Sequence, residues 1–510
     1  MHYTKDWFSK WAMYEPDKVA IREADSGREI TYGELNKRSD LVAFAFQQLG
    51  LQKGDRVAIL SEFCLEYVLL LGVAQRLGII LVPLNYRLSG RELDYILYNS
   101  SPKMVITDLA YRHLLNGQDY YEAIQHRLSI QDIFKLEEYA EKEVRLLKRE
   151  ELEENDPLFI LYTSGTTGFP KGALYTHGMM FWNSVNTEIT LTVTSNDHTI
   201  VCMPPFHTGG WNVLLTPLLM HGACITLMPK FDADKVLKEL EEQKITLFMA
   251  VPTMLKMMAD SPLFEEVDLS PLRYFIVGGE AMPIPLIEQW ANKGVMVRQG
   301  FGLTEAGPNI TSLHHRDAIR KKGSIGLPNF YIETRLVDDK GEDVKEGEVG
   351  EFLIKGPIVT PGYWKNPEAT AQAFYGEWFR TGDLLKQDRE GYLYVMDRIK
   401  HMYISGGENV YPAEVEHALR EQEGIKEIAI VGVPDEKWGE TGFALIVGEG
   451  ETVLTEDIVL QKCQGILARY KQPRHFYFVN ELPKGDTGKI NRKEVKKIAL
   501  EQLAQQTANV

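Results

Sequence analysis

The hydrophobic residues in the first part of the chain form short continuous runs that alternate with stretches of helical spacing. Residues 55–60 (DRVAIL) and residues 79–83 are short apolar runs, which are typical of buried strands. Residues 66–77, which lie between them, carry apolar side chains at helical spacing. Thr31, followed three residues later by Glu34, has the sequence of a capping box at a helix start. Strands and helices that alternate in this way predict layered α/β subdomains.

Further along the chain the pattern changes to shorter elements. Residues 324–395 are rich in short apolar runs and turn residues, which predicts a small β-subdomain. Residues 397–400 (DRIK) are mostly charged and lie between two longer segments, as an interdomain linker would. With 510 residues, the chain is also too long for a single hydrophobic core. We therefore predict two or more domains of α/β class.

The charge balance narrows the classes of partner. The chain has 56 Lys and Arg against 72 Asp and Glu, a formal net charge of −16, which argues against a general nucleic-acid binder. Positive charge gathers between residues 461 and 500, where ten Lys and Arg stand against three acidic residues. This segment is either a local site for a polyanionic substrate or a solvated helix face.

Cysteine usage and hydropathy give expectations about compartment. The chain has four cysteines without close spacing, so we expect neither a disulfide framework nor a zinc site. The first twenty residues contain no apolar run of the secretory type. No window reaches the roughly 18 apolar residues that a bilayer span needs. We therefore expect a cytoplasmic protein with no membrane span.

A polar, glycine-rich loop follows one of the apolar runs. Residues 161–172 read LYTSGTTGFPKG, directly after the apolar run 158–161. The glycines allow close approach of the backbone, the hydroxyls and N–H groups can donate to phosphate oxygens, and Lys171 adds a positive charge. The loop is not a Walker A motif, because Phe169 and Pro170 separate the lysine from the preceding glycine. It indicates a polyphosphate site, with a flexible surface loop as the alternative.

This loop resembles the phosphate-binding signature of the adenylate-forming superfamily, which includes acyl-CoA synthetases, peptide-synthetase adenylation domains and luciferases. Six further segments resemble the superfamily in the same order, so the resemblance covers nearly the whole chain. It implies a large N-terminal domain (1–396) of layered α/β subdomains plus a small β-subdomain. It also implies a hinge (397–400) with Lys400 as pivot, and a small, mobile α+β C-terminal domain (401–510). The implied small molecules are ATP, Mg²⁺, coenzyme A and a carboxylic acid.

The resemblance also assigns a nucleotide site. Phe301 would stack on adenine, where relatives usually have Tyr. Asp383 would accept the ribose hydroxyls with Arg398 beside it, and Glu305 and Thr167 would hold Mg²⁺. The predicted ATP- and AMP-binding residues are Thr163, Ser164, Gly165, Thr166, Thr167, Gly168, Gly279, Glu280, Ala281, Gln299, Gly300, Phe301, Gly302, Asp383 and Arg398.

Five residues are assigned to catalysis in the same way. Lys489 would stabilise the charge of the transition state, and Thr304 would bond the α-phosphate. A lone histidine after a strand is usually structural, but His207 matches the histidine that lies beside the acyl carboxylate. The predicted catalytic residues are Lys489, Thr304, Glu305, His207 and Lys171.

The remaining assignments concern the acid and coenzyme A. Gln472 stands where relatives have an Arg for the CoA phosphates, and Lys471 or Arg474 could replace it. Trp211 would either shorten the acyl pocket or pack outside it, and the buried amide of Asn309 suggests an acid with a polar group. The predicted CoA-binding residues are Gly406, Gly407, Trp438, Tyr470 and Lys471. The predicted acyl-pocket residues are His207, Gly209, Trp211, Val213, Gly278, Ala281, Gly300, Pro308 and Asn309.

The resemblance predicts an AMP-forming acid–CoA ligase, with a homodimer among the assemblies it allows. Residues 304–308 (TEAGP) resemble aryl-acid ligases, whereas residues 405–416 (SGGENVYPAEVE) resemble bacterial fatty-acid ligases. We rank a medium- or long-chain fatty acid slightly ahead of an aryl acid. The alternatives are acyl transfer to a carrier protein, a luciferase-type oxygenase and a non-catalytic acyl or nucleotide sensor. Against the carrier-protein alternative, this chain lacks the Asp that grips an amino group after the His207 motif. Against a sensor, Lys489, Glu305 and Lys171 are all present.

Overall fold

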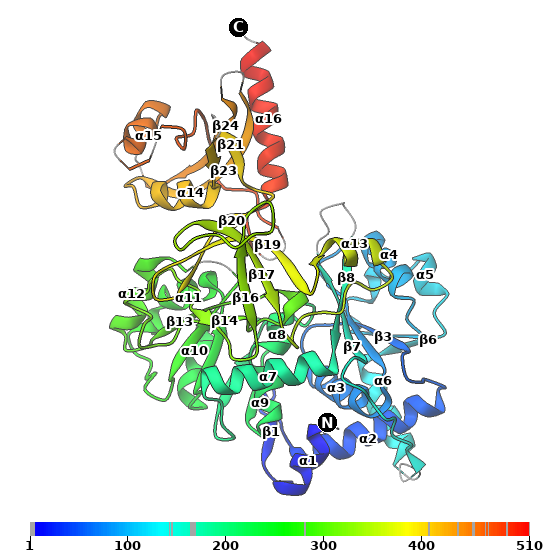
Figure 1. The fold of residues 1–510 in the computed structure, drawn as a ribbon. Coiled ribbons are helices and arrows are strands. Elements are labelled where there is room, and N and C mark those ends of the chain that lie inside the picture. The colour runs from blue at the N-terminus through cyan, green and yellow to red at the C-terminus, as the bar shows by residue number, and fades with distance from the viewer. Residues whose placement is uncertain are drawn as a thin grey trace. The chain divides into compact units, whose positions relative to one another are not determined.

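The computed structural model describes residues 6–141, 143, 146–163, 170–279, 282–405, 408–435, 438–450, 454–464, 466–467, 469–485 and 488–508. The chain divides into two compact units (Figure 1). The first unit consists of residues 1–334 and 354–379, and the second of residues 335–353 and 380–510. The chain passes between them within β16 (Glu333–Val337), β17 (Val349–Lys355) and β19 (Trp378–Gln387).

One sheet of the first unit has six strands in the order β6-β5-β3-β4-β7-β8. Its strands pair in parallel, except for the antiparallel β7–β8 hairpin. The predicted strands at residues 55–60 and 79–83 are confirmed as β3 and β4, and the predicted helix between them is α3 (Leu65–Leu77). The strands are β3 (Arg56–Leu60), β4 (Ile80–Pro83), β5 (Met104–Thr107), β6 (His126–Ser129), β7 (Pro157–Thr163) and β8 (Lys171–Thr176).

The second sheet of this unit has nine strands in the order β15-β14-β13-β12-β11-β9-β10-β1-β2. The central strands β10, β9, β11, β12 and β13 are all parallel, so their carboxyl ends meet at one edge of the sheet. The strands are β1 (Val19–Glu23), β2 (Glu29–Thr31), β9 (His198–Val201), β10 (Cys224–Leu227), β11 (Leu247–Ala250), β12 (Tyr274–Val277), β13 (Val297–Phe301), β14 (Thr311–Ser312) and β15 (Leu327–Pro328).

Helices cover these sheets, and one large apolar cluster draws side chains from both sheets and from α2, α3, α7 and α9. The predicted capping box is confirmed: Thr31 Oγ1 accepts from Glu34 N, and Glu34 Oε2 accepts from Thr31 N. The other helices of the unit are α1 (Trp7–Tyr14), α2 (Tyr32–Gln48), α4 (Gly90–Ser100), α5 (Asp119–Glu122), α6 (Ile130–Ala140), α7 (His177–Leu191), α8 (Thr208–Asn212), α9 (Leu215–Met220), α10 (Ala233–Glu242), α11 (Pro252–Ala259), α12 (Ile284–Asn292) and α13 (Pro367–Gln372).

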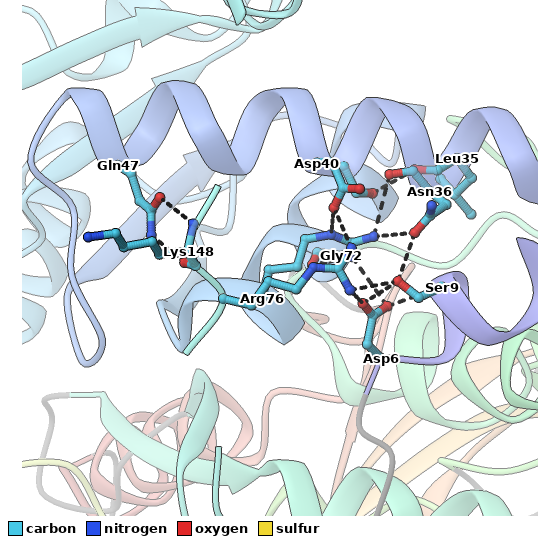
Figure 2. A network of polar contacts seen from close by, with 11 residues as sticks. Asp6, Ser9, Leu35, Asn36, Asp40, Gln47, Gly72, Arg76 and Lys148 are labelled. Carbon is cyan, nitrogen blue, oxygen red and sulfur yellow. Dashed lines mark hydrogen bonds and ion pairs between the residues drawn. The ribbon is translucent and has the colours of Figure 1, made fainter. Parts of the chain in front are cut away.

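A buried arginine joins the N-terminal helices (Figure 2). Arg76 on α3 is fully buried, and its guanidinium lies 2.5 Å from Asp40 Oδ1 on α2 and 3.3 Å from Asp6 Oδ1. Arg149, from the segment before β7, contacts the same two carboxylates at 2.8 Å each. Gln47 Nε2 donates to the carbonyl of the neighbouring Lys148. The network therefore fastens α1, α2, α3 and the segment before β7 to one another.

The second unit contains the strands on either side of the predicted linker. In the five-stranded sheet β16-β17-β19-β18, β20 also pairs with β19, and the C-terminal sheet has the order β22-β21-β24-β23 with β25 on β24. β18 (Phe374–Tyr375) belongs to the first unit. The further strands of the second unit are β20 (Leu393–Arg398), β21 (Tyr403–Ser405), β22 (Glu408–Val410), β23 (Ile425–Asp435), β24 (Gly439–Gly448) and β25 (His475–Phe478). The helices are α14 (Pro412–Arg420), α15 (Glu456–Cys463) and α16 (Arg492–Ala508).

The predicted α/β fold class is confirmed, and the predicted domain limits stay a prediction. Residues 397–400 lie inside the second unit, because β20 packs on α14 and Asp397 Oδ2 accepts from Ala413 N at 2.8 Å. All four cysteines are free thiols. Among the described residues, every helix falls short of the length and apolar character that crossing a membrane requires.

Candidate active site

Three loops with predicted site residues leave the same edge of the nine-stranded sheet. His207 follows β9, Gly278 and Gly279 follow β12, and Gly302 follows β13. The carboxyl ends of these parallel strands share an edge, and ligands of open α/β sheets bind outside that edge. The topology therefore brings together residues that lie far apart in the sequence.

The phosphate loop connects β7 to β8. Thr163 and Lys171 are directly opposite each other at the open end of this hairpin. Five predicted nucleotide-binding residues between them lie outside the described residues: Ser164, Gly165, Thr166, Thr167 and Gly168. The hairpin thus sets both ends of the loop, while the loop's own contacts and the predicted metal ligand Thr167 stay predictions.

A short segment runs along β8 and reaches the predicted metal ligand. Residues 360–364 pair with β8 through the antiparallel bridge Ala173–Tyr363 and the hydrogen bond from Trp364 N to Gly172 O, 2.8 Å. At the other end of the segment, Thr360 N donates to the carbonyl of Glu305 at 2.7 Å. The segment therefore joins β8 to η4 (Thr304–Ala306), the short 3₁₀ helix that carries both Thr304 and Glu305.

Tyr363 lies between the two charged residues of this region. Its hydroxyl donates to Glu305 Oε1 at 3.0 Å, and Lys171 Nζ lies 5.4 Å from its ring centroid. Burial raises the pKa of the Tyr363 hydroxyl, and the adjacent Glu305 carboxylate raises it further, so the hydroxyl remains protonated. Within the described parts of the chain, neither Lys171 nor the second oxygen of Glu305 forms an ion pair. The contacts of Tyr363 could not be predicted from the sequence, because its partners come from distant segments.

The turn after β13 is closed by backbone contact. A Cβ on Gly302 would lie 2.1 Å from the carbonyl oxygen of Pro308, so a side chain has no space there. Gln299 fixes the neighbouring loops, since its Oε1 accepts from Met282 N at 3.1 Å and its Nε2 donates to Ser324 O at 3.4 Å. Phe301 ends β13. Glu280 and Ala281 lie outside the described residues, and Gly279 before them has a left-handed φ of +86°.

The predicted acyl-pocket residues differ in how closely other atoms pack around them. His207 precedes α8, and its ring lies 4.6 Å from that of Phe206. A Cβ on Gly209 would lie 3.6 Å from Met249 Cε, and one on Gly278 would lie 3.5 Å from Gly300 O. Both distances are ordinary van der Waals contacts, so packing does not require glycine at either position. A Cβ on Gly300 would be more crowded, 3.1 Å from Thr311 O.

Trp211 and Asn309 have partners inside the protein. Trp211 is fully buried, its ring packs on Phe63 and Phe159 at 4.8 and 4.9 Å, and its indole N–H donates to Pro205 O. Trp211 is therefore a packed core residue, and its predicted contribution to the acyl pocket stays a prediction. Asn309 Nδ2 donates to Thr187 Oγ1 and lies 3.3 and 3.4 Å from the carbonyls of residues 212 and 213. The amide thus needs no acid to supply its hydrogen-bond acceptors.

In the second unit, Asp383 and Arg398 form a pair across β19 and β20. They are opposite each other in the register, and Arg398 Nε lies 2.8 Å from Asp383 Oδ1. Asp383 is only 2% exposed, and its buried Oδ2 has no hydrogen-bond partner among the described residues. Burial raises the pKa of Asp383 against the opposing effect of Arg398. A buried carboxylate oxygen without a donor fits a ligand that carries hydroxyl groups.

The predicted coenzyme A residues also belong to the second unit, except that Gly406 and Gly407 lie outside the described residues. Lys471 Nζ lies 2.6 Å from Glu414 Oε1, so its charge is already paired. Arg474 lies over the ring of Trp438, with its Cζ 5.9 Å from the centroid. Of the two cations that could replace the missing Arg at Gln472, Arg474 is therefore the better placed, because it lies beside Trp438, a predicted CoA-binding residue.

Lys400 and Lys489 occupy different surroundings within this unit. Burial lowers the pKa of Lys400, and the positive charge of Arg398 lowers it further. Lys489 is exposed in a turn, where its carbonyl accepts from Gly485 N at 2.8 Å.

Residues 8–364 match the family described as AMP-binding enzyme, and residues 414–489 match its C-terminal domain. A feruloyl-CoA synthase from an Amycolatopsis species is 36% identical over 96% of this chain and 98% of its own length. An indoleacetate–CoA ligase from Aromatoleum aromaticum is 38% identical over 97% of each chain. A long-chain-fatty-acid–CoA ligase from Mycobacterium tuberculosis is 38% identical over 94% of this chain and 95% of its own. The structure of O-succinylbenzoate coenzyme A synthetase from Bacillus subtilis with ATP and magnesium matches with a TM-score of 0.84 at 30% identity, covering 96% of this chain and 99% of that one.

Proposed function

We propose that this chain, which belongs to the adenylate-forming superfamily of AMP-binding enzymes, joins a medium- or long-chain fatty acid to coenzyme A. The coarser class, an AMP-forming CoA ligase, agrees with the relatives, which are named as CoA synthases and ligases. Their acids differ, from ferulate and indoleacetate to long-chain fatty acids, so the acid rests on our ranking. An aryl acid is the alternative.

The observation that carries the proposal is the arrangement at Tyr363. Lys171 and Glu305 both contact Tyr363, yet within the described residues neither forms an ion pair. An ammonium and a carboxylate without ion-pair partners fit a nucleoside triphosphate with its Mg²⁺. The phosphate oxygens attract the ammonium, and Mg²⁺ prefers oxygen ligands such as the carboxylate. Glu305 and Thr167 would hold the ion, which when bound neutralises phosphate charge. The orphan Oδ2 of Asp383 likewise fits the ribose hydroxyls.

The reaction has two displacements. A carboxylate oxygen of the acid attacks the α-phosphorus of ATP, the bond to the β-phosphate oxygen breaks, and pyrophosphate leaves with an acyl-AMP remaining. The thiolate of coenzyme A then attacks the acyl carbonyl, and AMP leaves with the electron pair. Neither step needs a covalent enzyme intermediate, so the protein contributes positioning and charge. Lys171 would bind phosphate oxygens, Asp383 would orient the ribose and Lys489 would stabilise the first transition state.

The test is pyrophosphate release with ATP and Mg²⁺ over a panel of fatty and aryl acids, with and without coenzyme A. We expect turnover that depends on coenzyme A and is fastest for fatty acids of medium or long chain. Faster turnover of aryl acids would replace the favoured acid by the alternative. Pyrophosphate release without thioester would point to a carrier protein or an oxygenase, and ATP binding without turnover to a sensor. Cytoplasmic location and a homodimer stay predictions from sequence.

A further inference from the structure

Tyr363 has an arrangement that neither its packing nor the family assignment explains. Its hydroxyl donates to Glu305 Oε1 at 3.0 Å, and its ring faces Lys171 Nζ at 5.4 Å. It therefore contacts both charged residues that the proposed function places at the ATP phosphates. A buried phenol takes a hydrogen-bond partner wherever it packs, and here that partner is the predicted metal ligand Glu305.

The backbone around Tyr363 is fixed independently of its side chain. Its N–H donates to Thr370 Oγ1 at 3.0 Å, and residue 364 on its other side donates to Gly172 O at 2.8 Å. The preceding Gly362 has φ of +142°, and a Cβ there would lie 2.5 Å from Thr370 Cγ2. These contacts set where the phenol ring lies. The position of Glu305 then follows from two bonds, one to its carbonyl from Thr360 N and one to its carboxylate from Tyr363.

The hydrogen bond also sets which carboxylate oxygen is available. With Oε1 bonded to the phenol, Oε2 is the Glu305 oxygen that has no donor within the described part of the chain. A carboxylate held by one oxygen has lost rotational freedom before a ligand arrives, which lowers the entropy cost of binding. Groups of this kind that orient a metal ligand commonly affect metal affinity 10- to 100-fold, as an order of magnitude.

We propose that Tyr363 is a positioning residue for the magnesium complex of ATP. Its hydroxyl orients the Glu305 carboxylate toward the ion, and its ring keeps the Lys171 ammonium next to the same phosphates. This inference rests on the proposed function, because it assigns Glu305 to Mg²⁺ and Lys171 to ATP. Tyr363 thereby gains a role beyond its place in the segment predicted as a β-subdomain.

The test compares the full-length chain with Tyr363→Phe, which removes the hydroxyl and keeps the ring on Lys171. ATP binding is measured by calorimetry, once with excess Mg²⁺ and once with EDTA. We expect the variant to bind ATP about tenfold more weakly with Mg²⁺, and equally well in EDTA. The Mg²⁺ concentration for half-maximal pyrophosphate release should rise by a similar factor. An equal loss in both media, or no loss in Mg²⁺, would overturn the proposal.

Two further variants separate positioning from a structural effect. Tyr394→Phe removes another phenol–carboxylate bond, 3.2 Å from Asp388 Oδ2, in the second unit, and should change neither affinity. Glu305→Gln should make the Tyr363→Phe change almost silent, because the hydroxyl then has no carboxylate to orient. If the two changes add fully, the hydroxyl acts elsewhere and the proposal is wrong.

The same measurements separate this inference from the proposed function. A wild-type chain that binds ATP equally with and without Mg²⁺, and releases no pyrophosphate with any acid, would overturn both. A wild-type chain whose ATP binding depends on Mg²⁺, together with a Tyr363→Phe variant that behaves identically, would overturn only the role of Tyr363.

Discussion

The environment of the Asp383 carboxylate lowers the stability of the protein when no ligand is bound. The carboxylate is buried, and among the residues that the structure describes only one of its oxygens has a partner, Arg398, whose own side chain is 46% exposed. Leaving a charged oxygen without a donor costs free energy, and such groups persist where a ligand completes them. Hydroxyl groups of a ribose would provide the missing donors, so the cost to stability is consistent with the predicted role.

Asp383→Asn should therefore separate binding from stability. We expect AMP and ATP to bind about tenfold more weakly or worse, because hydrogen bonds to a charged acceptor are lost. The thermal unfolding midpoint should not fall, because the variant no longer buries a charge. Burial raises the pKa of Asp383, so the wild type loses stability relative to the variant as pH rises from the ordinary Asp value through the raised one. A midpoint that falls at neutral pH would contradict this account.

The glycines near the predicted acyl pocket fall into two groups that sequence does not distinguish. Gly302 is required by the close approach of the Pro308 backbone, whereas Gly278 has ordinary space around it. A sequence shows both as glycines in loops after strands. The difference depends on which backbone lies opposite, and that follows from the tertiary arrangement.

The matched variants Gly302→Ala and Gly278→Ala test this difference. The first places a Cβ 2.1 Å from a carbonyl oxygen that cannot move away, so we expect destabilisation of about 2 kcal/mol or more. The second should leave the thermal unfolding midpoint unchanged and raise the KM for bulky acids, if Gly278 lines the acyl pocket. Equal midpoints for the two variants would show that the backbone at Gly302 yields, and an unchanged acid profile would remove Gly278 from the pocket.

At the scale of elements, periodicity predicted the strands and helices with strong amphipathic or buried patterns. The limits of β3, α3 and β4 agree within one residue, because burial on a sheet or under helices imposes the pattern directly. Residues 360–364 have no such pattern. Their position follows from contacts with β8, which lies far away in the sequence, so Tyr363 could not be connected to Glu305 in advance.

The arginine network of the N-terminal helices gives a prediction about how elements are held together. Arg76→Met leaves Asp6 and Asp40 without their buried partner, and we expect a loss of roughly 3 kcal/mol. Arg149→Met removes contacts to the same carboxylates from a side chain that is 42% exposed, and should cost about 1 kcal/mol or less. Unfolding midpoints of both variants give the comparison. A larger loss at Arg149 would mean that the exposed cation, not the buried one, fastens the helices.

At the scale of the whole molecule, the sequence predicted a large N-terminal domain and a small C-terminal domain, and these limits stay a prediction. The resemblance places the hinge at residues 397–400, and the compact units of the structure divide within β16, β17 and β19. Asp383 and Arg398 thus share a unit with Lys400, which composition could not reveal because contacts rather than chain order define a unit. Motion about Lys400 stays a prediction, which a comparison of the two half-reactions tests.

Lys400→Pro and Lys489→Ala should affect opposite halves of the reaction. Proline fixes φ and so restricts the backbone change that the proposed hinge needs. We expect Lys400→Pro to keep acyl-AMP formation, seen as a burst of pyrophosphate, and to slow thioester formation from a supplied acyl-AMP. Lys489→Ala should do the reverse, with adenylation slowed about 10²- to 10³-fold and thioester formation retained, because only the first transition state uses that charge. If both half-reactions slow equally in both variants, the two lysines do not serve separate steps, and the assignment of Lys400 as a pivot is wrong.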